Sequence, residues 1–272
     1  MKEQYEIEFI SFKDKLSSFI FRLVTNRQDT EDIVQETYLK AFEKLNTFRK
    51  QSSFKTWVFT IAMNTAKNHL EKQKRWQENA QDYGANLHSK SPEYWERFQH
   101  VFKSTPDQEY DIKEHISYCF NCINKTLPLK QQVCLLLKEV YHFKVDEIIQ
   151  ITNLTEGVVK HALADARKNM IRIFDGRCAF VNKNGVCHQC TELTGILNSK
   201  QNAYIKAQEV KMVQEGNSVD KEYLLDLRLE LVKGINPLNS KNTLVTTYFL
   251  EHSEKWVIEG KLKKVLKKPS EK

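Results

Sequence analysis

Six cysteines are the residues of this chain whose type and spacing could do chemistry most directly. Cys119 and Cys122 form one C-x-x-C pair, Cys187 and Cys190 form a second, and Cys178 lies between them. Two such pairs can bind one Zn²⁺ through four thiolates. The pairs therefore predict a metal site made of Cys119, Cys122, Cys187 and Cys190, with Zn²⁺ as the candidate cofactor.

Other interpretations of these cysteines stay open. About sixty residues separate the pairs, against roughly fifteen to twenty in a zinc ribbon, so convergence would depend on tertiary folding. Cys119 and Cys122 are one helical turn apart and could belong to a core, and Cys134 follows an apolar pattern typical of a buried thiol. A functional role is favoured for Cys187 and Cys190, which fall in a loop. Metal binding, redox sensing and a structural role remain alternatives.

Composition and charge narrow the class of protein. The 272 residues, with 40% hydrophobic content, 8 Gly and 5 Pro, suit two or three small helical domains. The net charge of +7 suits a polyanionic partner, although it is a weak signal alone. The N-terminus lacks the apolar core of a signal peptide, and no apolar run could span a bilayer. We therefore expect a cytoplasmic protein with no membrane partner.

Three amphipathic helices are predicted before residue 77, enough for a compact bundle. The first covers about 3–24, the second begins at Asp29 or Thr30, and the third is capped by Ser52 or Ser53. The second helix presents a polar outer face that includes Asp32, Gln35, Glu36 and Glu43. The third ends in a run of basic residues that includes Lys67, Lys72, Lys74 and Arg75.

A second helical unit follows a polar linker, 77–110, in which we expect one short helix near 93–103. The unit ends in a short helix at 145–151, a tight connection, and a longer basic helix that is capped by Thr155 and stops near Gly176. This order is a helix-turn-helix signature. In such a motif the second helix enters the major groove, so its outward residues would reach DNA: Glu156, Gly157, Lys160, His161, Ala164, Arg167 and Lys168.

The two helical units in series resemble the ECF-type sigma factors of RNA polymerase. Residues 29–76, which open DTEDIVQETYLKAFEKL, resemble region 2 of that family, and residues 126–173, which open TLPLKQQVCLLLKEVY, resemble region 4. The resemblance covers residues 1 to about 175. It implies a factor without catalysis of its own that binds core polymerase and promoter DNA, with an anti-sigma factor as a further candidate partner.

The resemblance also implies roles for particular residues. Asp32, Gln35 and Glu36 would meet the clamp of the polymerase β′ subunit, and the β flap is a further expected polymerase contact. The third helix would read and help to open the −10 element through Asn64, Lys67, Asn68, Lys74 and Arg75. Core packing is favoured over base stacking for Trp57, which shares its face with Phe54. Region 4 would read the −35 element through Lys160, His161, Arg167 and Lys168, where Lys160 could bind a guanine edge or a phosphate.

One departure from the family concerns the start of the recognition helix. The family usually carries a small uncharged residue followed by Thr-Val, whereas this chain has Glu156-Gly157-Val158. Glu156 could accept from a cytosine or simply favour the helix N-terminus, and the second interpretation is preferred.

The expected fold is mainly α: two helical bundles, joined by a linker, with a small α+β extension. We expect a region 2-like domain (1–76), a linker (77–110), a region 4-like domain (111–176) and an extension with a regulatory role (177–272). In the extension, about 200–214 and 219–233 are predicted helices, 236–239 a turn, and 243–251 and 255–258 strands. The Lys-rich end, 261–268, fits a solvated tail better than a DNA contact.

Two rival functions remain. A conventional repressor or activator would share the helix-turn-helix but would not bind polymerase. A thiol oxidoreductase or zinc enzyme would use the C-x-x-C pairs, but redox pairs normally lie at a strand-to-helix junction, which Cys119 and Cys122 lack.

Overall fold

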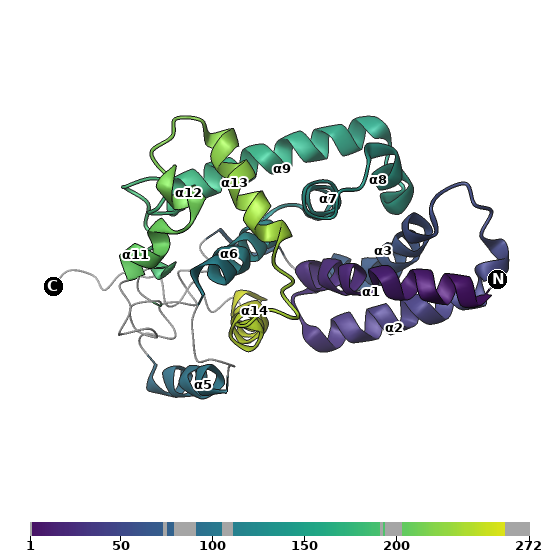
Figure 1. The fold of residues 1–272 in the computed structure, drawn as a ribbon, viewed down its shortest axis with the longest axis horizontal. Helices are drawn as coiled ribbons and strands as arrows, with labels where there is room; N and C mark the ends of the chain where they lie inside the picture. Colours follow the sequence, from purple (N-terminus) through teal and green to yellow (C-terminus); the bar gives the residue numbers. More distant parts are fainter. Residues whose placement is uncertain are drawn as a thin grey trace. The chain divides into compact units, whose positions relative to one another are not determined.

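The computed structural model describes residues 2–72, 75–78, 91–104, 111–190, 193 and 203–258. These residues form helices and turns, with one isolated β-bridge between Cys178 and Cys187, so the mainly-α prediction is confirmed (Figure 1). The helices in chain order are α1 (Lys2–Val24), α2 (Arg27–Glu43), η1 (Leu45–Thr47), α3 (Phe54–Lys72), α5 (Pro92–Lys103), α6 (Ile112–Thr126), α7 (Leu129–Leu135), η3 (Leu136–Val140), α8 (Val145–Thr152), α9 (Glu156–Arg177), α11 (Ala203–Gln208), α12 (Lys211–Gln214), α13 (Lys221–Lys233) and α14 (Thr243–Ile258).

Two compact units divide the chain. Unit 1 comprises residues 1–74 and 127–168, and unit 2 comprises 75–126 and 169–272. The packing therefore groups the helix-turn-helix with the first three helices, whereas the sequence motifs group it with residues 111–126. No helix in the described ranges is long and apolar enough to cross a membrane.

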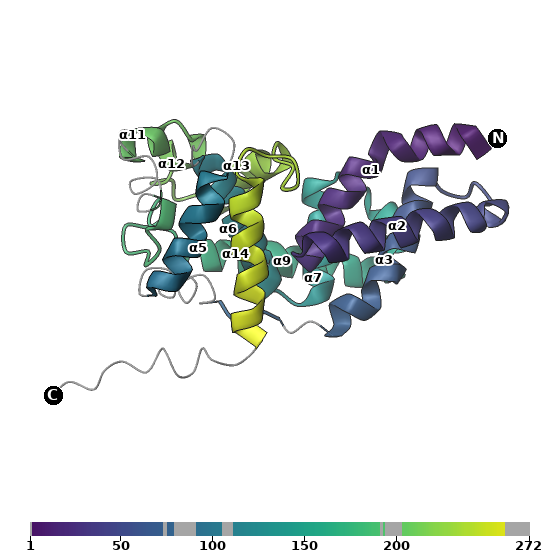
Figure 2. The same cartoon turned by 90° about the horizontal axis from the view of Figure 1, so that it is seen from below.

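In unit 1, helices α1, α2 and α3 lie side by side, as two perpendicular views show (Figures 1 and 2). Their shared core is aromatic. Phe59 of α3 is fully buried, and its ring centroid lies 5.5 Å from that of Phe19 and 6.3 Å from that of Phe12, both on α1. The apolar spacing that predicted these helices therefore does mark their buried faces.

The start of the second helix differs from the prediction. Helix α2 begins at Arg27, and its N-cap is Asn26, whose side chain accepts a hydrogen bond of 2.9 Å from the backbone N–H of Asp29. Thr25 ends α1 in the left-handed region, with φ 58°, so the chain turns at once into the new cap. The predicted start at Asp29 or Thr30 is wrong because Asn26 caps the helix one turn earlier. For α3, the predicted cap Ser53 is confirmed: its Oγ accepts from the backbone N–H of Thr56 at 3.0 Å.

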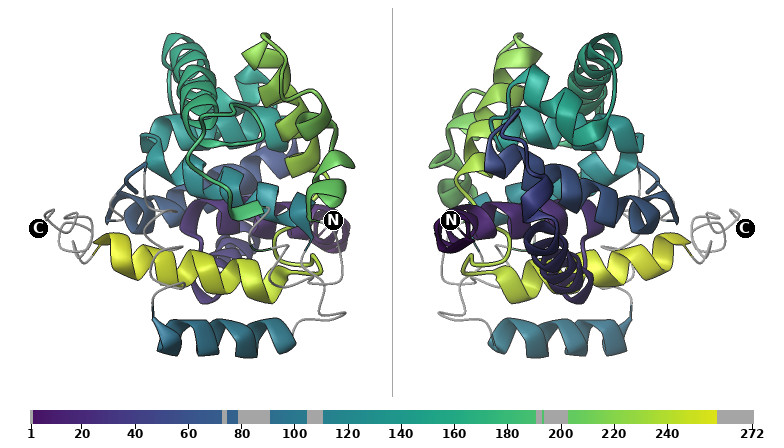
Figure 3. Two further views of the ribbon diagram at one scale, coloured as in Figure 1. Left: turned by 90° about the vertical axis from the view of Figure 1, so that its left-hand side faces the viewer. Right: turned by 90° about the vertical axis from the view of Figure 1, so that its right-hand side faces the viewer.

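Unit 2 contains the expected short helix, α5, which runs beside α14 (Figure 3). Phe98 of α5 is fully buried, and its ring stacks on that of Phe249 with centroids 5.0 Å apart. Glu114 of α6 accepts hydrogen bonds from the backbone N–H groups of Lys241 and Asn242 at 2.9 and 2.6 Å, just before α14 begins. These contacts position α14 against α5 and α6.

Helix α14 corrects the expectation of a strand-bearing extension. Residues 243–251 and 255–258 were predicted as strands from their β-branched and aromatic content, but both segments are helical. The aromatic face of α14 packs on Phe98 and on Tyr118 of α6, and Glu114 holds the backbone just before the helix; these tertiary contacts outweigh the weak β-propensity. Among the described residues of the extension, the β component is only the bridge between Cys178 and Cys187.

The predicted helices and the predicted turn of the extension are confirmed. Helices α11, α12 and α13 fall within the two predicted helical ranges, and Asp220 caps α13. The turn at 236–239 is confirmed by a hydrogen bond of 3.2 Å from the N–H of Asn239 to the carbonyl of Asn236. The Lys-rich end, 261–268, lies outside the described residues.

Candidate nucleic-acid interface

The helix-turn-helix predicted from the sequence is present in unit 1. Helix α8 ends at Thr152, Asn153 adopts the left-handed conformation with φ 54°, and α9 begins at Glu156. Asparagine tolerates this conformation better than most residues, which allows a short turn. Glu147 supports the start of α8 by accepting from the backbone N–H of Lys144 at 2.8 Å. The tight connection between a short and a long helix is therefore built as expected.

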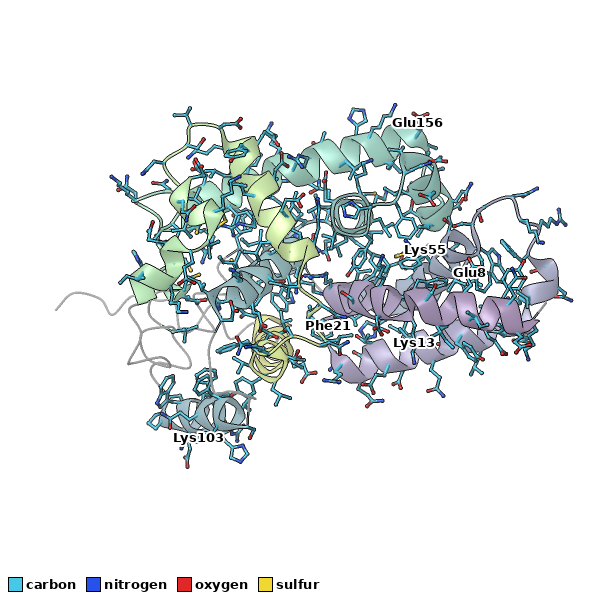
Figure 4. All side chains as sticks on the ribbon, viewed as in Figure 1. Glu8, Lys13, Phe21, Lys55, Lys103 and Glu156 are labelled. Carbon is cyan, nitrogen blue, oxygen red and sulfur yellow. The ribbon has the colours of Figure 1, made fainter. Side chains whose placement is uncertain are left out.

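The N-terminal part of α9 presents exposed side chains. Figure 4 places Glu156 at the N-terminal end of this helix, pointing outward. Lys160 forms an ion pair of 2.7 Å with Glu156, and both side chains are more than half exposed. The hydrogen bond from Lys160 lowers the pKa of the Glu156 carboxyl. Glu156 thus lies in the first turn of α9, where an acidic side chain interacts favourably with the helix dipole. Its ion pair keeps Lys160 on the exposed N-terminal part of the helix.

Further along α9, the predicted DNA residues divide into two kinds. His161 and Lys168 are exposed. Arg167 is only 23% exposed, and its guanidinium lies 3.2 Å from the carboxylate of Glu139 in η3. The ion pair couples α9 to η3, so Arg167 contributes to packing within the unit as well as to its charge. Gly157 has open space where a Cβ would stand, which permits close backbone approach to a ligand.

The later half of α3 carries the second group of predicted DNA contacts. Asn64, Lys67 and Asn68 are exposed, and Lys67 lies 3.8 Å from Glu71, one turn on. Arg75 is also exposed, whereas Lys74 lies outside the described residues. These residues give α3 an exposed polar face at its C-terminal end, where its basic residues are concentrated.

Trp57 lies in the first half of α3 and packs among aromatic rings. Its ring centroid is 5.1 Å from that of Phe48 and 5.8 Å from that of Phe54. The side chain is half-buried rather than presented to solvent. The packing interpretation of Trp57 agrees with this geometry.

The acidic face of α2 is exposed as predicted from its spacing. Asp32, Gln35 and Glu36 all lie on the solvent side of the helix. Gln28 donates a hydrogen bond of 3.0 Å to Asp32, and Lys40 lies 2.6 Å from Glu36. These are i,i+4 pairs between exposed side chains, which contribute little to stability and leave the face open to a partner.

Packing between α3 and α8 was not predicted. Thr56 of α3 is fully buried and donates a hydrogen bond of 2.9 Å to Glu147 of α8, and Lys55 lies 4.4 Å from the centroid of the Phe143 ring. Figure 4 shows Lys55 on the α3 side of this contact. Because α8 contacts the first half of α3, the exposed polar residues of the second half remain open.

A buried polar contact joins α1 to the helix-turn-helix segment. The hydroxyls of Ser18 and Tyr141 are 2.8 Å apart, and the buried Arg22 interacts with the same Tyr141. Burial lowers the pKa of the Arg22 guanidinium. More than a hundred residues separate the partners in the chain, so no local pattern could have predicted their contact.

The cysteines are all thiols, and the predicted four-cysteine set is not assembled as a metal centre. Within the described ranges, no group of three or more His, Cys, Asp or Glu side chains has the geometry to hold a metal ion. Cys122 is buried, at 2% exposure, on α6, and Cys134 is a fully buried thiol, as expected. Cys119, Cys187 and Cys190 interact electrostatically with one another and with Cys178, which was not in the predicted set.

Comparison with known proteins shows what this chain is similar to. Residues 9–76 match the family model of sigma-70 region 2. The chain is 28% identical over 174 residues to an ECF RNA polymerase sigma-E factor of Haemophilus influenzae, covering 61% of this chain and 85% of that protein. It is 26% identical over 168 residues to the RNA polymerase sigma-H factor of Pseudomonas aeruginosa, covering 61% and 84%. The chain is similar to these RNA polymerase sigma factors over 61% of its length.

The region 2 match ends at Trp76 and includes α2, α3 and most of α1, the helices that carry the acidic face and the first group of basic residues. A solved structure, the sigma factor RpoE in complex with the anti-sigma factor NepR from Bartonella quintana, is similar with a TM-score of 0.44 and 18% identity, covering 63% of this chain and 97% of that one. The alignments with these two sigma factors leave more than a third of this chain unmatched.

Proposed function

We propose that this chain is an ECF-type sigma factor, which binds core RNA polymerase and directs initiation at promoters defined by −35 and −10 elements. It contributes no catalysis of its own. The observation that carries the proposal is the combination of a region 2 match over α1 to α3 with an exposed recognition helix, α9, in the same chain. We place its action in the cytoplasm, where it would meet polymerase and promoter DNA.

The polymerase contact is assigned to α2. Asp32, Gln35 and Glu36 form an exposed acidic and polar face without a buried structural role. Such a face fits a basic helical partner, which we take to be the clamp of the β′ subunit, and the helix-turn-helix would meet the β flap. Electrostatic complementarity of this kind sets orientation and association rate.

The DNA contacts are assigned to two helices. On α3, Asn64, Lys67 and Asn68 would bind the −10 element. Lys74 and Arg75 would contact the adjoining DNA backbone. An opened strand needs polar groups for its bases and cations for its phosphates, which these side chains supply. On α9, Lys160 and His161 would reach base edges of the −35 element, while Arg167 and Lys168 would hold phosphates.

For the domains, we propose a region 2-like part (1–76), a linker (77–110), a region 4-like part (111–176) and a regulatory extension (177–272). An anti-sigma factor is a further candidate partner of the polymerase-binding faces. The helix-turn-helix segment packs with the first three helices in unit 1, so use of both DNA surfaces on one promoter would require that packing to adapt.

Run-off transcription with purified core polymerase tests the proposal. Addition of the full chain should produce transcripts from a promoter fragment, and Asp32→Ala should lower polymerase affinity while leaving the helix-turn-helix intact. Asp14→Ala is the matched control, since Asp14 is an exposed acid on α1 outside the proposed face. A chain that binds DNA but neither copurifies with core polymerase nor supports transcription would be a conventional regulator, and the proposal would be wrong.

The two helices can be separated in the same assay. Lys160→Ala should weaken dependence on the −35 sequence by about tenfold or more while polymerase affinity stays unchanged. Lys130→Ala, an exposed lysine on neighbouring α7, should leave both unchanged. Equal losses of −35 dependence in Lys160→Ala and Lys130→Ala would show that DNA binding depends only on general positive charge.

A further inference from the structure

Three cysteines lie on one short loop that follows α9. The N–H of Cys187 donates to the carbonyl of Arg177 at 2.8 Å, and the N–H of Ala179 donates to the carbonyl of Cys187 at 3.3 Å. These bonds form the β-bridge that holds Cys178 beside Cys187. Cys190 follows three residues later and packs against the apolar cluster that includes Ile112 and Met212. The loop therefore gathers three thiols at one end of α9.

The backbone of this loop is packed closely enough to require glycine. A Cβ on Gly185 would lie 2.6 Å from the carbonyl carbon of Cys178 and 2.7 Å from the nitrogen of Ala179. A Cβ on Gly216 would lie 2.0 Å from the carbonyl oxygen of Phe180, in the same loop. Since both close contacts are to backbone atoms, no side chain can move aside to relieve them. The loop is thus a defined structure that is supported from the segment after α12.

Arg228 of α13 brings the fourth thiol into the group. Arg228 is 2% exposed as a residue, and its guanidinium covers the ring of Phe174, 3.3 Å from the centroid. One terminal nitrogen lies 4.0 Å from the sulfur of Cys119, on α6, and the other lies 3.6 Å from the sulfur of Cys178. In the part of the chain that the structure describes, these sulfurs are the polar partners of Arg228. A buried cation needs negative charge nearby, which cysteine side chains supply as thiolates.

We propose that Cys119, Cys178, Cys187 and Cys190 bind one thiophilic divalent metal ion, Zn²⁺, as a Cys₄ site with Arg228 as its buried counter-charge. Four thiols exchange their protons for the metal: Zn²⁺ + 4 RSH → [Zn(SR)₄]²⁻ + 4 H⁺. The product carries two negative charges, which the guanidinium of Arg228 partly offsets. All five residues belong to unit 2.

This ligand set differs from the pairing of two C-x-x-C motifs by one residue, with Cys178 in place of Cys122. The described thiols do not stand at coordinating geometry, so the metal would draw the sulfurs to about 2.3 Å from itself. Cys178, Cys187 and Cys190 share one loop, and Cys119 reaches the same guanidinium as Cys178. Closure therefore requires side-chain movement around Arg228 rather than a new fold.

Metal analysis of the full chain tests the site. Protein purified with a phosphine reductant and without chelator should contain one zinc per chain, and the metal-free protein should bind Co²⁺ with the spectrum of four thiolate ligands. Cys178→Ser should lose the stoichiometric zinc and the four-thiolate spectrum. Cys122→Ser and Cys134→Ser are matched controls, as both remove a buried thiol, and each should keep metal and spectrum.

Two further variants distinguish the loss of a metal ligand from misfolding of the protein. Cys178→His keeps a ligand at the position and should retain bound metal with a spectrum of mixed sulfur and nitrogen ligands. Arg228→Met keeps all four thiols and should weaken Zn²⁺ affinity by about 10–100-fold, as for other supporting residues around metal sites. Absence of bound Zn²⁺ and of a thiolate spectrum in the folded wild type would overturn the proposal. So would loss of metal in Cys122→Ser with retention in Cys178→Ser.

Discussion

The two units of this chain are stabilised in different ways. Unit 1 has long helices whose aromatic rings form one continuous core, illustrated by Phe59 between Phe12 and Phe19. Unit 2 combines shorter helices and a loop with buried polar groups, illustrated by Arg228 among thiols and Glu114 beneath the start of α14. Burial of aromatic rings stabilises a core as long as its apolar positions and total volume are kept. A buried charge is stable only beside particular partner groups.

This difference explains where each unit should be sensitive. In unit 1, changes that remove apolar volume should have the largest effects on stability, alongside loss of the buried Arg22 beside Tyr141. In unit 2, changes of charge, pH or metal should matter as well. Both units lie in one chain, so each serves as the internal reference for the other.

The largest expected effect comes from removing one aromatic side chain in each unit. Phe59→Ala and Phe98→Ala delete fully buried rings, and each should lower the free energy of unfolding by about 3–5 kcal/mol. Urea unfolding followed by hydrogen exchange should show Phe59→Ala acting on unit 1 and Phe98→Ala on unit 2. Leu39→Ala and Val219→Ala are exposed controls and should have little effect. A single shared transition in both variants would mean that the two units unfold as one.

Acidification should affect unit 2 through His115. Burial lowers the pKa of this imidazole from 6.5 to about 4. The unfolded chain therefore takes up a proton first as pH falls, and the folded state loses stability between those two values, by up to about 3 kcal/mol. Unfolding measured from neutral pH downward should show this loss in unit 2, and His115→Phe should remove it. The same slope in wild type and His115→Phe would assign the effect to another group.

A smaller effect is expected at the contact between α3 and α8. Thr56→Val keeps the shape of the side chain but removes its hydrogen bond to Glu147, so unit 1 should lose about 1–2 kcal/mol. Thr47→Val, at an exposed position, is the control. Chemical denaturation measures the difference. If the two variants were equally stable, the α3–α8 contact would depend on its apolar side chains alone.

The smallest effect concerns the ion pair between Glu78 and Arg172 in unit 2. Arg172 lowers the pKa of the Glu78 carboxyl through a hydrogen bond, so its stabilisation is present above the ordinary pKa and is lost as pH falls. Both side chains are about half exposed, which limits the contribution to below about 1 kcal/mol. A double-mutant cycle of Glu78→Gln and Arg172→Gln near neutral pH should give a coupling within that limit. A larger coupling would show that the pair is shielded from solvent.

The sequence by itself determined the helices of unit 1 and the helix-turn-helix. Their apolar residues repeat at helical spacing, and their polar faces, such as Asp32 with Glu36 and Lys160 with His161, follow from the same repeat. Helical periodicity is a local property, so it can be read without knowing the neighbours. The short helix at α5 was found in the same way, from an aromatic-rich stretch that needed a surface to pack on.

Only the tertiary structure decided the nature of α14, the packing of α8 on α3, and the fourth member of the cysteine group. Residues 243–251 have strand-like content but are helical because α5 and α6 offer a surface that fits a helix. Cys178 lies beside Cys187 because the loop closes at Gly185, and Arg228 reaches both Cys119 and Cys178 from a helix far along the chain. Such contacts depend on distance in space, which spacing along the chain does not encode.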